Sequence, residues 1–569
     1  MSETTTAGSS RFTAEGVLYA LAVAAALAVR LWGLGRAPLG ENEARLALQA
    51  LEVAARHPTP LGDAPLLTGL TGLAFFLLGS TDAVARLVPA LLGGLLPLLA
   101  WPLRKPLGRR AALLLAFALA FDPGLVALSR AADSPVPAVL ALSAAVLAAA
   151  HARWDWALPL TLLGLLLGPS FWFGVLTVLL ALALYRVMGF SLTLALPPDR
   201  LRAGIRRSLV VAAVGSTLAF WMPEGLGAWF NGLSAFIHTL VPLAPVPVRV
   251  LVVALIAYAP LATGAAIGGA ALLWKRRQPT ATFALATALS ALMLAVLYPG
   301  RSVPVLVWAL LPLWVVGAWA LVQIPLERPA DTAWQAALTL ALLTFSWLSL
   351  LAWSQRPAGS PQAILQLGLV IASLLLVPLL SALLAFSRPR SPHPWRESLL
   401  GPTWGLVAAA VLLTVSAFSR AAYGPRPAEL WYPAPAPPQL RLLQTTLADL
   451  GQQRHGLPNT LEVTLLAPEE RLFSLRWLLH DDPNAQVTNA LAPNAQPEAI
   501  LAFANWKPTQ TQAYRGQDFP LVLVPPLLPT ATLQETIQWM AFRTPRPAGN
   551  TVILWVRTDL FPGHAESAP

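Results

Sequence analysis

Long blocks of Leu, Ala and Val recur along the chain, and most of them approach the length of a membrane-spanning helix. Such a helix needs about 20 apolar residues to cross roughly 30 Å of hydrocarbon. Only 11% of the residues are charged, about half the fraction in an average soluble domain. We therefore expect an all-α polytopic membrane domain with about thirteen transmembrane helices. The candidate spans are 16–34, 84–102, 111–129, 134–152, 156–168, 171–189, 208–222, 247–274, 279–298, 303–324, 333–353, 363–386 and 398–418.

The distribution of Arg and Lys predicts the orientation of these spans. Basic residues are enriched in cytoplasmic loops, and the chain has four basic clusters between the spans: Arg104, Lys105, Arg109 and Arg110; Arg200, Arg202, Arg206 and Arg207; Lys275–Arg277; and Arg388, Arg390 and Arg396. With about thirteen spans and a cytoplasmic N-terminus, all four clusters lie inside. We expect a multi-pass protein of the cell (plasma) membrane, in contact with the lipid bilayer. Segment 64–79 is expected to lie along the outer surface as an interfacial helix.

The hydrophobic blocks stop after Phe418, and a proline-rich connector leads into a region of different composition. We place a transmembrane domain at 1–423, with its first external loop at 35–83, and a small extracytoplasmic α/β domain at 424–569. Strands are predicted at 461–466, 499–503, 520–524 and 552–557, and helices at 469–480 and 533–542. Folding support, docking of a protein partner and polymer recognition are all compatible with such a domain. His480, Asp481 and Asp482 have the residue types of a metal cluster, but a solvated helix end is the preferred interpretation.

Composition disfavours several function classes. The chain has no Cys, which excludes disulfides, thiolate metal sites and cysteine nucleophiles. The net charge of +11 fits cytoplasmic loops rather than a nucleic-acid partner, because no basic stretch is interleaved with stacking aromatics. A secondary transporter is disfavoured because the span cores carry almost no acidic residues. The exception, Asp122 beside Pro123, is interpreted as a helix break.

The first external loop is predicted to contain a charged helix that begins at Glu41. One face of this helix carries charged and polar residues at spacings of three and four, namely Glu41, Arg45, Gln49, Glu52 and Arg56. Glu41–Arg45 and Glu52–Arg56 are expected to form ordinary exposed ion pairs.

Glu43 lies about 160° around the same helix from Glu41. Its neighbours on that side are Ala47, Ala50 and Ala54, and small residues let a helix approach its neighbours closely. The pattern therefore predicts a carboxylate that points into the protein. Such a group acts either as a catalytic base or as a buried Glu held by an Arg or by backbone groups.

Two further external loops carry charges. Arg130 and Asp133 are three residues apart in the loop after span 111–129 and could pair with each other. Arg301 follows span 279–298, on the side where positive residues are sparse. It either receives an anionic headgroup or reaches lipid phosphates at the membrane surface.

The order of short motifs resembles a known family. The motifs are Arg30-Leu31-Trp32, the acidic loop, Pro65-Leu66-Leu67, Leu78-Gly79-Ser80, Ala85-Arg86-Leu87-Val88, Gly108-Arg109-Arg110, Asp122-Pro123, Ser129-Arg130 with Asp133, and Leu297-Tyr298-Pro299-Gly300-Arg301 followed by Leu310-Leu311-Pro312-Leu313. This pattern looks like a GT-C superfamily membrane glycosyltransferase of glycosyltransferase family 39, the protein O-mannosyltransferase and aminoarabinose-transferase type. The segments 475–481 and 553–560 resemble the flippase-activity-associated branch of that family.

The resemblance implies a reaction in which a sugar on a polyprenyl phosphate moves to an acceptor hydroxyl at the outer membrane face. A phosphate is already a good leaving group, so the site needs a carboxylate base and a cation for the departing phosphate. No metal or other cofactor is implied. The candidate catalytic residues are Glu43, Asp133 and Glu41, and the candidate substrate-binding residues are Asn42, Arg130, Arg301 and Arg45.

The sequence departs from the family at Asn42. The family's Asp-Glu pair aligns with Asn42-Glu43, and an amide cannot serve as a general base. Two hypotheses follow. Either Glu43, Glu41 or Asp133 supplies the base of an active transferase, or the chain is an inactive relative that acts as a membrane scaffold, a lipid-binding protein or a subunit of a complex.

Overall fold

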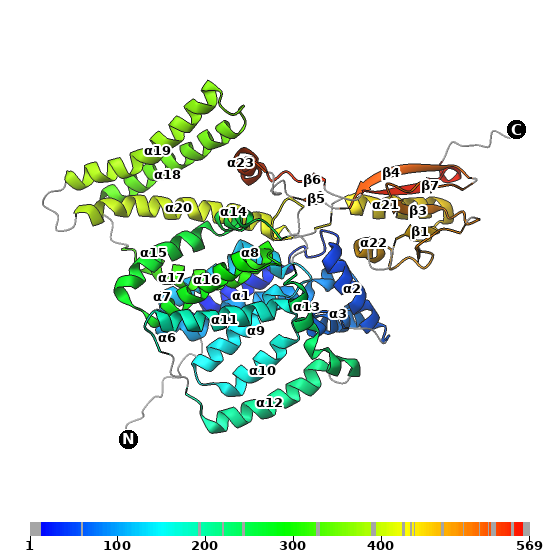
Figure 1. The fold of residues 1–569 in the computed structure, drawn as a ribbon, viewed down its shortest axis with the longest axis horizontal. Coiled ribbons are helices and arrows are strands. Elements are labelled where there is room, and N and C mark those ends of the chain that lie inside the picture. Colours follow the sequence, from blue (N-terminus) through cyan, green and yellow to red (C-terminus); the bar gives the residue numbers. More distant parts are fainter. Residues whose placement is uncertain are drawn as a thin grey trace, which may run out of the picture.

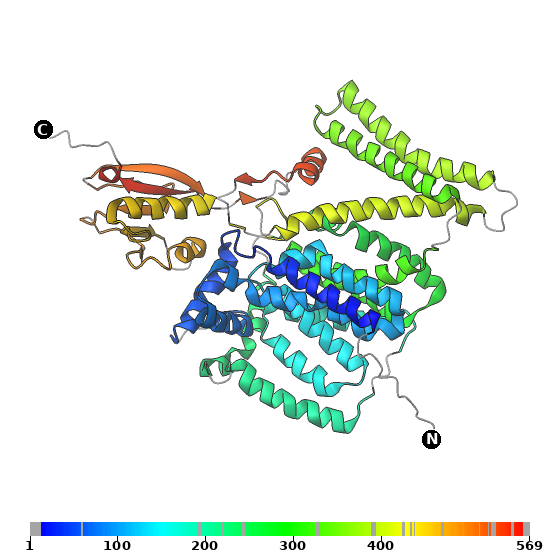
Figure 2. The same cartoon turned by 180° about the vertical axis from the view of Figure 1, so that it is seen from behind.

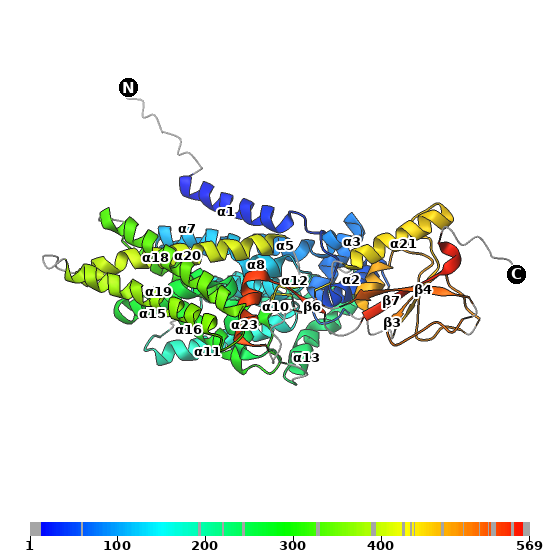
Figure 3. The ribbon, with the colours of Figure 1, turned by 90° about the horizontal axis from the view of Figure 1, so that it is seen from above.

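The computed structural model describes residues 13–57, 61–191, 195–218, 221–241, 245–325, 330–387, 394–423, 427–432, 435–436, 439–467, 472–492, 494–510, 512–521, 523–524, 531–547 and 551–561. A bundle of helices fills most of the molecule, and a small sheet lies at one end of it (Figures 1, 2 and 3). The predicted fold class, a helical membrane domain followed by a small α/β domain, is confirmed.

The bundle is built from helices of very different length. They are α1 (Ala14–Leu31), α2 (Glu41–Ala54), α3 (Pro65–Leu78), α4 (Asp82–Ala85), α5 (Leu87–Gly94), η1 (Leu96–Leu103), α6 (Arg104–Leu107), α7 (Arg109–Phe121), α8 (Pro123–Ser129), α9 (Pro135–Ala150), α10 (Trp154–Leu165), α11 (Pro169–Val187), α12 (Pro198–Ser216), η2 (Pro223–Phe230), α13 (Asn231–His238), α14 (Val248–Tyr258), α15 (Pro260–Arg276), α16 (Pro279–Leu297), η3 (Val303–Leu306), α17 (Val307–Val322), α18 (Ala330–Ser354), α19 (Pro361–Phe386) and α20 (Pro394–Ala422). A helix lies over every predicted span.

Within the described residues, 8 helices are long and apolar enough to cross a membrane, or up to 10 if each of two bent pairs counts as one span. The protein is therefore a multi-pass membrane protein. The count of about thirteen crossings and the cytoplasmic position of the N-terminus stay predictions.

The two bent pairs both break in front of a proline. Helices α7 and α8 meet at 49°, and α14 and α15 meet at 97°. Proline lacks the N–H of a helical hydrogen bond and its ring clashes with the preceding turn. At the first break, the Asp122 carboxylate accepts hydrogen bonds from Leu125 N at 2.8 Å and Trp314 Nε1 at 2.7 Å. Asp122 thus caps α8, as expected of an Asp-Pro helix break.

Helices α2 and α3 pack together at the end of the bundle that carries the sheet (Figure 1). Ala44, Ala47 and Ala50 of α2 are fully buried, and a Cβ added to Gly72 of α3 would lie 2.9 Å from the Ala50 carbonyl oxygen. The small residues therefore allow the close approach that the sequence predicted. The opposite face of α3 is apolar and exposed at Leu73, Phe76, Leu77 and Leu78, which suits the interfacial position expected for this segment.

The C-terminal part contains α21 (Gln439–His455), β1 (Val463–Leu466), α22 (Phe473–Leu478), β2 (Gln486–Thr488), β3 (Ala499–Phe503), β4 (Tyr514–Pro520), β5 (Leu523–Val524), α23 (Leu533–Phe542), β6 (Arg546–Pro547), β7 (Thr551–Arg557) and η4 (Thr558–Leu560). Five strands form a sheet in the order β2-β1-β3-β7-β4. Strand β1 runs parallel to β2 and β3, and β7 runs antiparallel to β3 and β4. We call residues 439–521 and 551–561 the C-domain.

One predicted strand was wrong. A single strand was expected at 520–524, but the strand of the main sheet, β4, ends at Pro520. Residues 523–524 form β5, which pairs with β6 in a separate two-stranded sheet. Strand β4 is an edge strand whose residues 515–518 are exposed. Its polar sequence therefore lacks the apolar run by which a buried strand is identified. Helix α21 and strand β2 were not predicted.

Two segments of the C-terminal part pack on the membrane helices rather than on the sheet. Trp431 and Trp539 belong to the hydrophobic core of the bundle, and Trp539 Nε1 donates to the Ala428 carbonyl at 2.9 Å. Gln534 and Gln538 of α23 donate to carbonyl groups at and just beyond the end of α18. The domain division at 423/424 stays a prediction.

Candidate functional site

Glu43 lies in the first turn of α2, and its carboxylate binds the backbone at the start of the same helix. Gly40 is the N-cap residue, and its N–H donates to Glu43 Oε2 at 3.0 Å. This bond from the N-cap N–H to the side chain of the third helical residue is one half of a capping box; glycine has no side chain to supply the other half. Glu43 is only 8% exposed, so its side chain points into the protein as the helical phase predicts.

A buried arginine completes the surroundings of Glu43. Arg86 is 0% exposed and donates from Nε to Glu43 Oε1 at 2.8 Å and from Nη2 to Oε2 at 2.7 Å. Ala132 N, in the loop after α8, donates to Oε1 at 2.9 Å. Together with Gly40, these groups use the roughly four lone-pair positions of a carboxylate. The observed arrangement is the buried Glu held by an Arg and by backbone groups.

Burial and these partners shift the pKa of Glu43 in opposite directions. Burial raises the pKa of Glu43, but the charge of Arg86 and the hydrogen bonds from Arg86, Gly40 and Ala132 outweigh burial and hold it below its ordinary value. Glu43 is therefore ionised at neutral pH. Its geometry suits holding the loops together better than taking up a proton.

Asp133 follows Ala132 directly and has a different environment. One of its oxygens, Oδ1, accepts a hydrogen bond from Ser134 N at 2.7 Å. No partner is found for Oδ2 among the described residues. Burial raises the pKa of Asp133 to about 6, and the negative charge of Glu43 acts in the same direction. A partly exposed carboxylate with a free oxygen and a pKa near neutrality has the properties of a general base.

Glu41 does not form the predicted ion pair with Arg45. Its carboxylate instead caps α22 of the C-domain, accepting from Phe473 N at 2.7 Å, Ser474 N at 3.1 Å and Ser474 Oγ at 2.9 Å. The unpaired N–H groups at a helix start attract an anion. The local helix pattern could not reveal this partner, because it lies more than 400 residues away in the sequence.

Arg45 and the second predicted pair also find other partners. Arg45 donates to Asp63 Oδ2 at 3.2 Å. Glu52 lies 2.8 Å from His57 Nδ1, and Arg56 stacks over the Trp221 ring at 4.2 Å. The helical face is thus polar as predicted, but the predicted pairings Glu41–Arg45 and Glu52–Arg56 were wrong.

Among the described residues, the remaining candidates make no hydrogen bond to the side chains of the Glu43–Arg86 pair. Arg130 caps the end of α1 by donating to the carbonyls of residues 29, 30, 32 and 33, and it makes no pair with Asp133. Arg301 donates to the Val246 and Val296 carbonyls at 2.8 and 2.9 Å. Asn42 is exposed on the first turn of α2.

The C-domain docks on the first loop through α22. Trp477 Nε1 donates to Asp82 Oδ1 at 2.8 Å. The Trp477 ring stacks with Phe75 and with His480, at centroid distances of 5.6 and 4.1 Å. His480 Nε2 lies 3.2 Å from Ser80 Oγ. No sequence pattern predicts this contact, apart from the family resemblance of segment 475–481.

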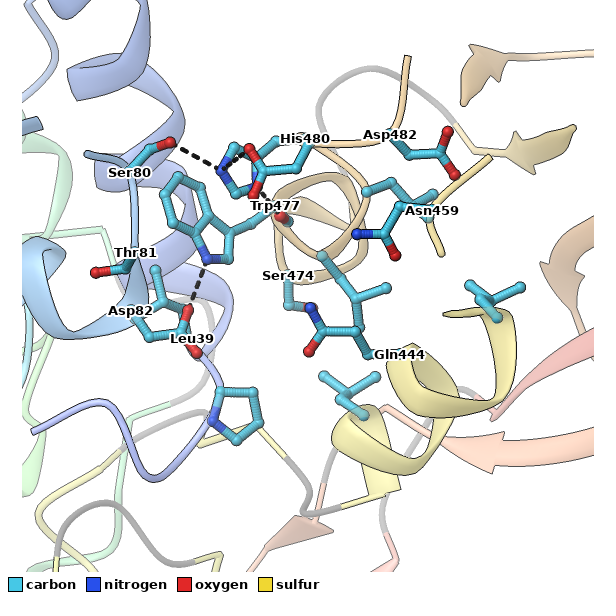
Figure 4. Close-up of a pocket in the computed structure, with 16 residues that line it drawn as sticks. Leu39, Ser80, Thr81, Asp82, Gln444, Asn459, Ser474, Trp477, His480 and Asp482 are labelled. Atoms are coloured by element: carbon cyan, nitrogen blue, oxygen red, sulfur yellow. Dashed lines mark hydrogen bonds and ion pairs between the residues drawn. The ribbon is translucent and has the colours of Figure 1, made fainter. Parts of the chain in front are cut away.

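A pocket of about 230 Å³ opens along this contact (Figure 4). It is lined by Pro38, Leu39, Ser80, Thr81, Asp82, Leu440, Gln444, Leu447, Asn459, Ser474, Trp477, Leu478, Leu479, His480, Asp481 and Asp482. Among the described residues, no group of three His, Asp or Glu side chains is arranged to hold a metal ion. The three residues 480–482 therefore border the pocket without forming a metal centre.

Arg86 is the residue that sequence reasoning missed. Arg86 belongs to the motif 85–88 of the family resemblance, which implies no role for it. The available signal was its position at the edge of an apolar block, where a charge is costly unless it is paired.

Comparison with solved structures identifies the fold. ArnT from Cupriavidus metallidurans matches with a TM-score of 0.55 in its apo state and in its complex with undecaprenyl phosphate, at 16% and 15% identity. Each match covers 96% of this chain and 99% of ArnT. The oligosaccharyltransferase from Archaeoglobus fulgidus, in complex with zinc and sulfate, gives a TM-score of 0.36 at 13% identity, over 82% of this chain and 62% of its own.

No protein-family model and no curated protein matched the chain. At such low identity the likeness to ArnT establishes the fold. The chain has the GT-C fold that the order of its motifs predicted, from its first helices to the C-domain. The detailed resemblance to the flippase-activity-associated branch stays a prediction.

Proposed function

We propose that this protein is a membrane glycosyltransferase that moves a sugar from a polyprenyl-phosphate donor to an acceptor hydroxyl at the outer face of the cell membrane. The likeness to ArnT over almost the whole chain supports this proposal, and ArnT has been crystallised with undecaprenyl phosphate. Because a shared fold does not establish a shared function, the proposal depends on the residues of the site.

The observation that carries the proposal is a pair of unlike carboxylates, Glu43 in the first loop and Asp133 in the loop after α8, where the two loops meet. Glu43 is saturated by Arg86 and backbone donors, whereas Asp133 keeps a free oxygen and has a pKa raised to about 6. Carboxylates whose environments push their pKa values apart take different roles. We assign Glu43 the positioning role and Asp133 the role of general base.

The proposed transfer step needs only groups of this chain and its substrates. The acceptor oxygen attacks the anomeric carbon opposite the phosphate, while the bond from that carbon to the phosphate oxygen breaks. The phosphate leaves with the electron pair, Asp133 Oδ2 takes the acceptor proton, and the configuration of the sugar inverts. Arg301 and Arg45 are the candidate cations for the departing phosphate, because their side chains are partly exposed.

An inactive GT-C relative is the second candidate. It is favoured by the amide at Asn42, where the resemblance implies a carboxylate, and by the firm contact of the C-domain with the first loop. In that case the chain would bind the carrier lipid and present the C-domain to a partner protein.

Reconstitution of the full-length protein into liposomes separates the two. Labelled undecaprenyl-phosphate sugars serve as donors, and a heat-treated membrane extract of the source cells serves as acceptor. We expect transfer by the wild type and at least about a hundredfold loss in Asp133→Asn, since a general base contributes about 10²–10⁴-fold. Asp199→Asn, a change on the exposed start of α12, is the matched control. Binding of undecaprenyl phosphate without transfer by the wild type would support the inactive relative.

A further inference from the structure

The pocket between the first loop and the C-domain is built from parts of the chain that lie far apart. Pro38 and Leu39 precede α2, and residues 80–82 follow α3. Gln444 projects from α21, which also supplies two leucines, Asn459 lies between α21 and β1, and the remaining wall belongs to α22 and the residues that follow it (Figure 4). The carbonyl of Pro38 also accepts a hydrogen bond from Arg86 at 3.0 Å. The pocket therefore shares a wall with the loop that holds Glu43.

The lining selects the chemistry of an occupant. The described residues that line the pocket carry three carboxylates, two carboxamides and three hydroxyl groups, and none of them is Lys or Arg. An anionic ligand such as a phosphate would be repelled, whereas the hydroxyl groups of a sugar would find many hydrogen-bond acceptors. Leucines at positions 39, 440 and 447 add apolar surface for the C–H groups of a sugar ring. The volume of about 230 Å³ lies below that of sites for drug-sized ligands and suits a single ring.

The carboxylates are dispersed around the wall rather than gathered on one point. Asp82 accepts from Trp477, Asp481 lies against His480 at 3.1 Å, and Asp482 accepts from Asn484 N at 2.9 Å. Among the described residues, each is oriented by one side-chain contact through Oδ1, and no partner is found for its Oδ2. The second oxygen of each carboxylate is thereby left for a ligand, whereas a cation would require them to converge.

The wall is also ordered before any ligand arrives. The Trp477 ring is stacked with two neighbouring rings, Phe75 at an interplanar angle of 21° and His480 at 10°. Rigid walls reduce the entropy that binding costs.

We propose that this pocket binds one ring of a neutral, hydroxyl-rich glycan. Resting on the proposed function, we further infer that this glycan is part of the acceptor. The C-domain then serves to hold the acceptor beside the first loop. Polymer recognition, one of the three roles compatible with this domain, thereby has a specific site.

Saturation-transfer NMR on the full-length protein in nanodiscs tests this inference, with the methyl glycosides of glucose, galactose, mannose and N-acetylglucosamine as probes. We expect at least one probe to bind, and Asp482→Asn and Gln444→Ala each to weaken binding by about tenfold, as loss of a ligand hydrogen bond implies. The matched controls Asp518→Asn and Gln453→Ala change exposed residues outside the pocket and should bind as the wild type does. Thermal unfolding of each variant checks that it is folded.

The inference is overturned if no glycoside binds to the wild type or if the pocket variants bind the glycosides like their controls. It is also overturned if the pocket binds Ca²⁺ or a polyamine and none of the glycosides. Because the measurement requires no transfer, its result is independent of the proposed activity. Glycan binding without transfer would support the pocket as a glycan site and would contradict the inference that this glycan is part of an acceptor.

Discussion

Glu43 and Arg86 form a bidentate ion pair with oxygen–nitrogen distances of 2.8 and 2.7 Å. Arg86 also donates to the carbonyls of Leu34, Ala37 and Pro38, so the pair fastens the chain that leads into α2. Through one guanidinium group, the residues that precede α2 are therefore tied to Glu43 on its first turn.

Arg86→Met is expected to destabilise the protein by about 3–5 kcal/mol, because it leaves the Glu43 carboxylate buried without its counter-charge. Thermal unfolding in detergent measures the effect. Arg109→Met is the matched control, since the Arg109 side chain is 83% exposed and lies 3.7 Å from Glu15. Such a surface pair contributes at most about 1 kcal/mol. The double variant Glu43→Leu/Arg86→Met should be more stable than Arg86→Met alone, and the opposite order would show that the pair is not the source of the loss.

The helical phase of the first loop was sufficient to predict where Glu43 points. A start at Glu41 and an alanine face at residues 47, 50 and 54 follow from local spacing. In the structure α2 starts at Glu41, Ala47 and Ala50 are fully buried, and Ala54 is half-buried. Likewise the apolar blocks predict the positions of the membrane helices, because length and hydropathy are properties of each segment alone.

Partners across the chain could not be predicted in this way. Glu41 and Phe473 are separated by 432 positions, and nothing in either segment encodes the other. A charged residue on an exposed helix face is assigned by default to a neighbour at i+4, which is why Glu41–Arg45 was expected. Strand β4 was missed for a related reason, since an edge strand shows little apolar alternation.

Transfer activity is expected to depend on pH through Asp133. The base must be ionised to accept a proton, and burial raises the pKa of Asp133 to about 6. Activity should therefore be low at pH 5, rise through pH 6 and level off above pH 7. Initial rates in proteoliposomes between pH 5 and 8 measure this profile. A residual activity of Asp133→Asn that still rose through pH 6 would assign the titration to another group.

Glu41→Gln is expected to loosen the contact between the C-domain and the first loop. The amide keeps one acceptor oxygen but loses the negative charge at the start of α22 and one of the two oxygens that hold it. Loss of a helix cap costs about 1 kcal/mol, which corresponds to about fivefold faster hydrogen exchange at residues 473–474. Glu52→Gln, which affects only the exposed pair with His57, is the control. Equal protection in both variants would contradict a capping role for Glu41.

Asn42→Asp tests whether the site is a transferase site with a relocated base. Asn42 is exposed on the first turn of α2, where a new carboxylate is favoured by the helix dipole by about 0.3–1 kcal/mol, so the fold should be retained. The resemblance to GT-C transferases implies that a carboxylate at this position takes the acceptor proton. We therefore expect Asn42→Asp to increase transfer by the wild type and to restore part of the activity lost in Asp133→Asn. Proteoliposome assays of the two single variants and the double variant make the comparison. If the added carboxylate changed the rate in neither background, residue 42 would lie outside the reacting region, and Asp133 would have to act in a geometry unlike that of the family the sequence resembles.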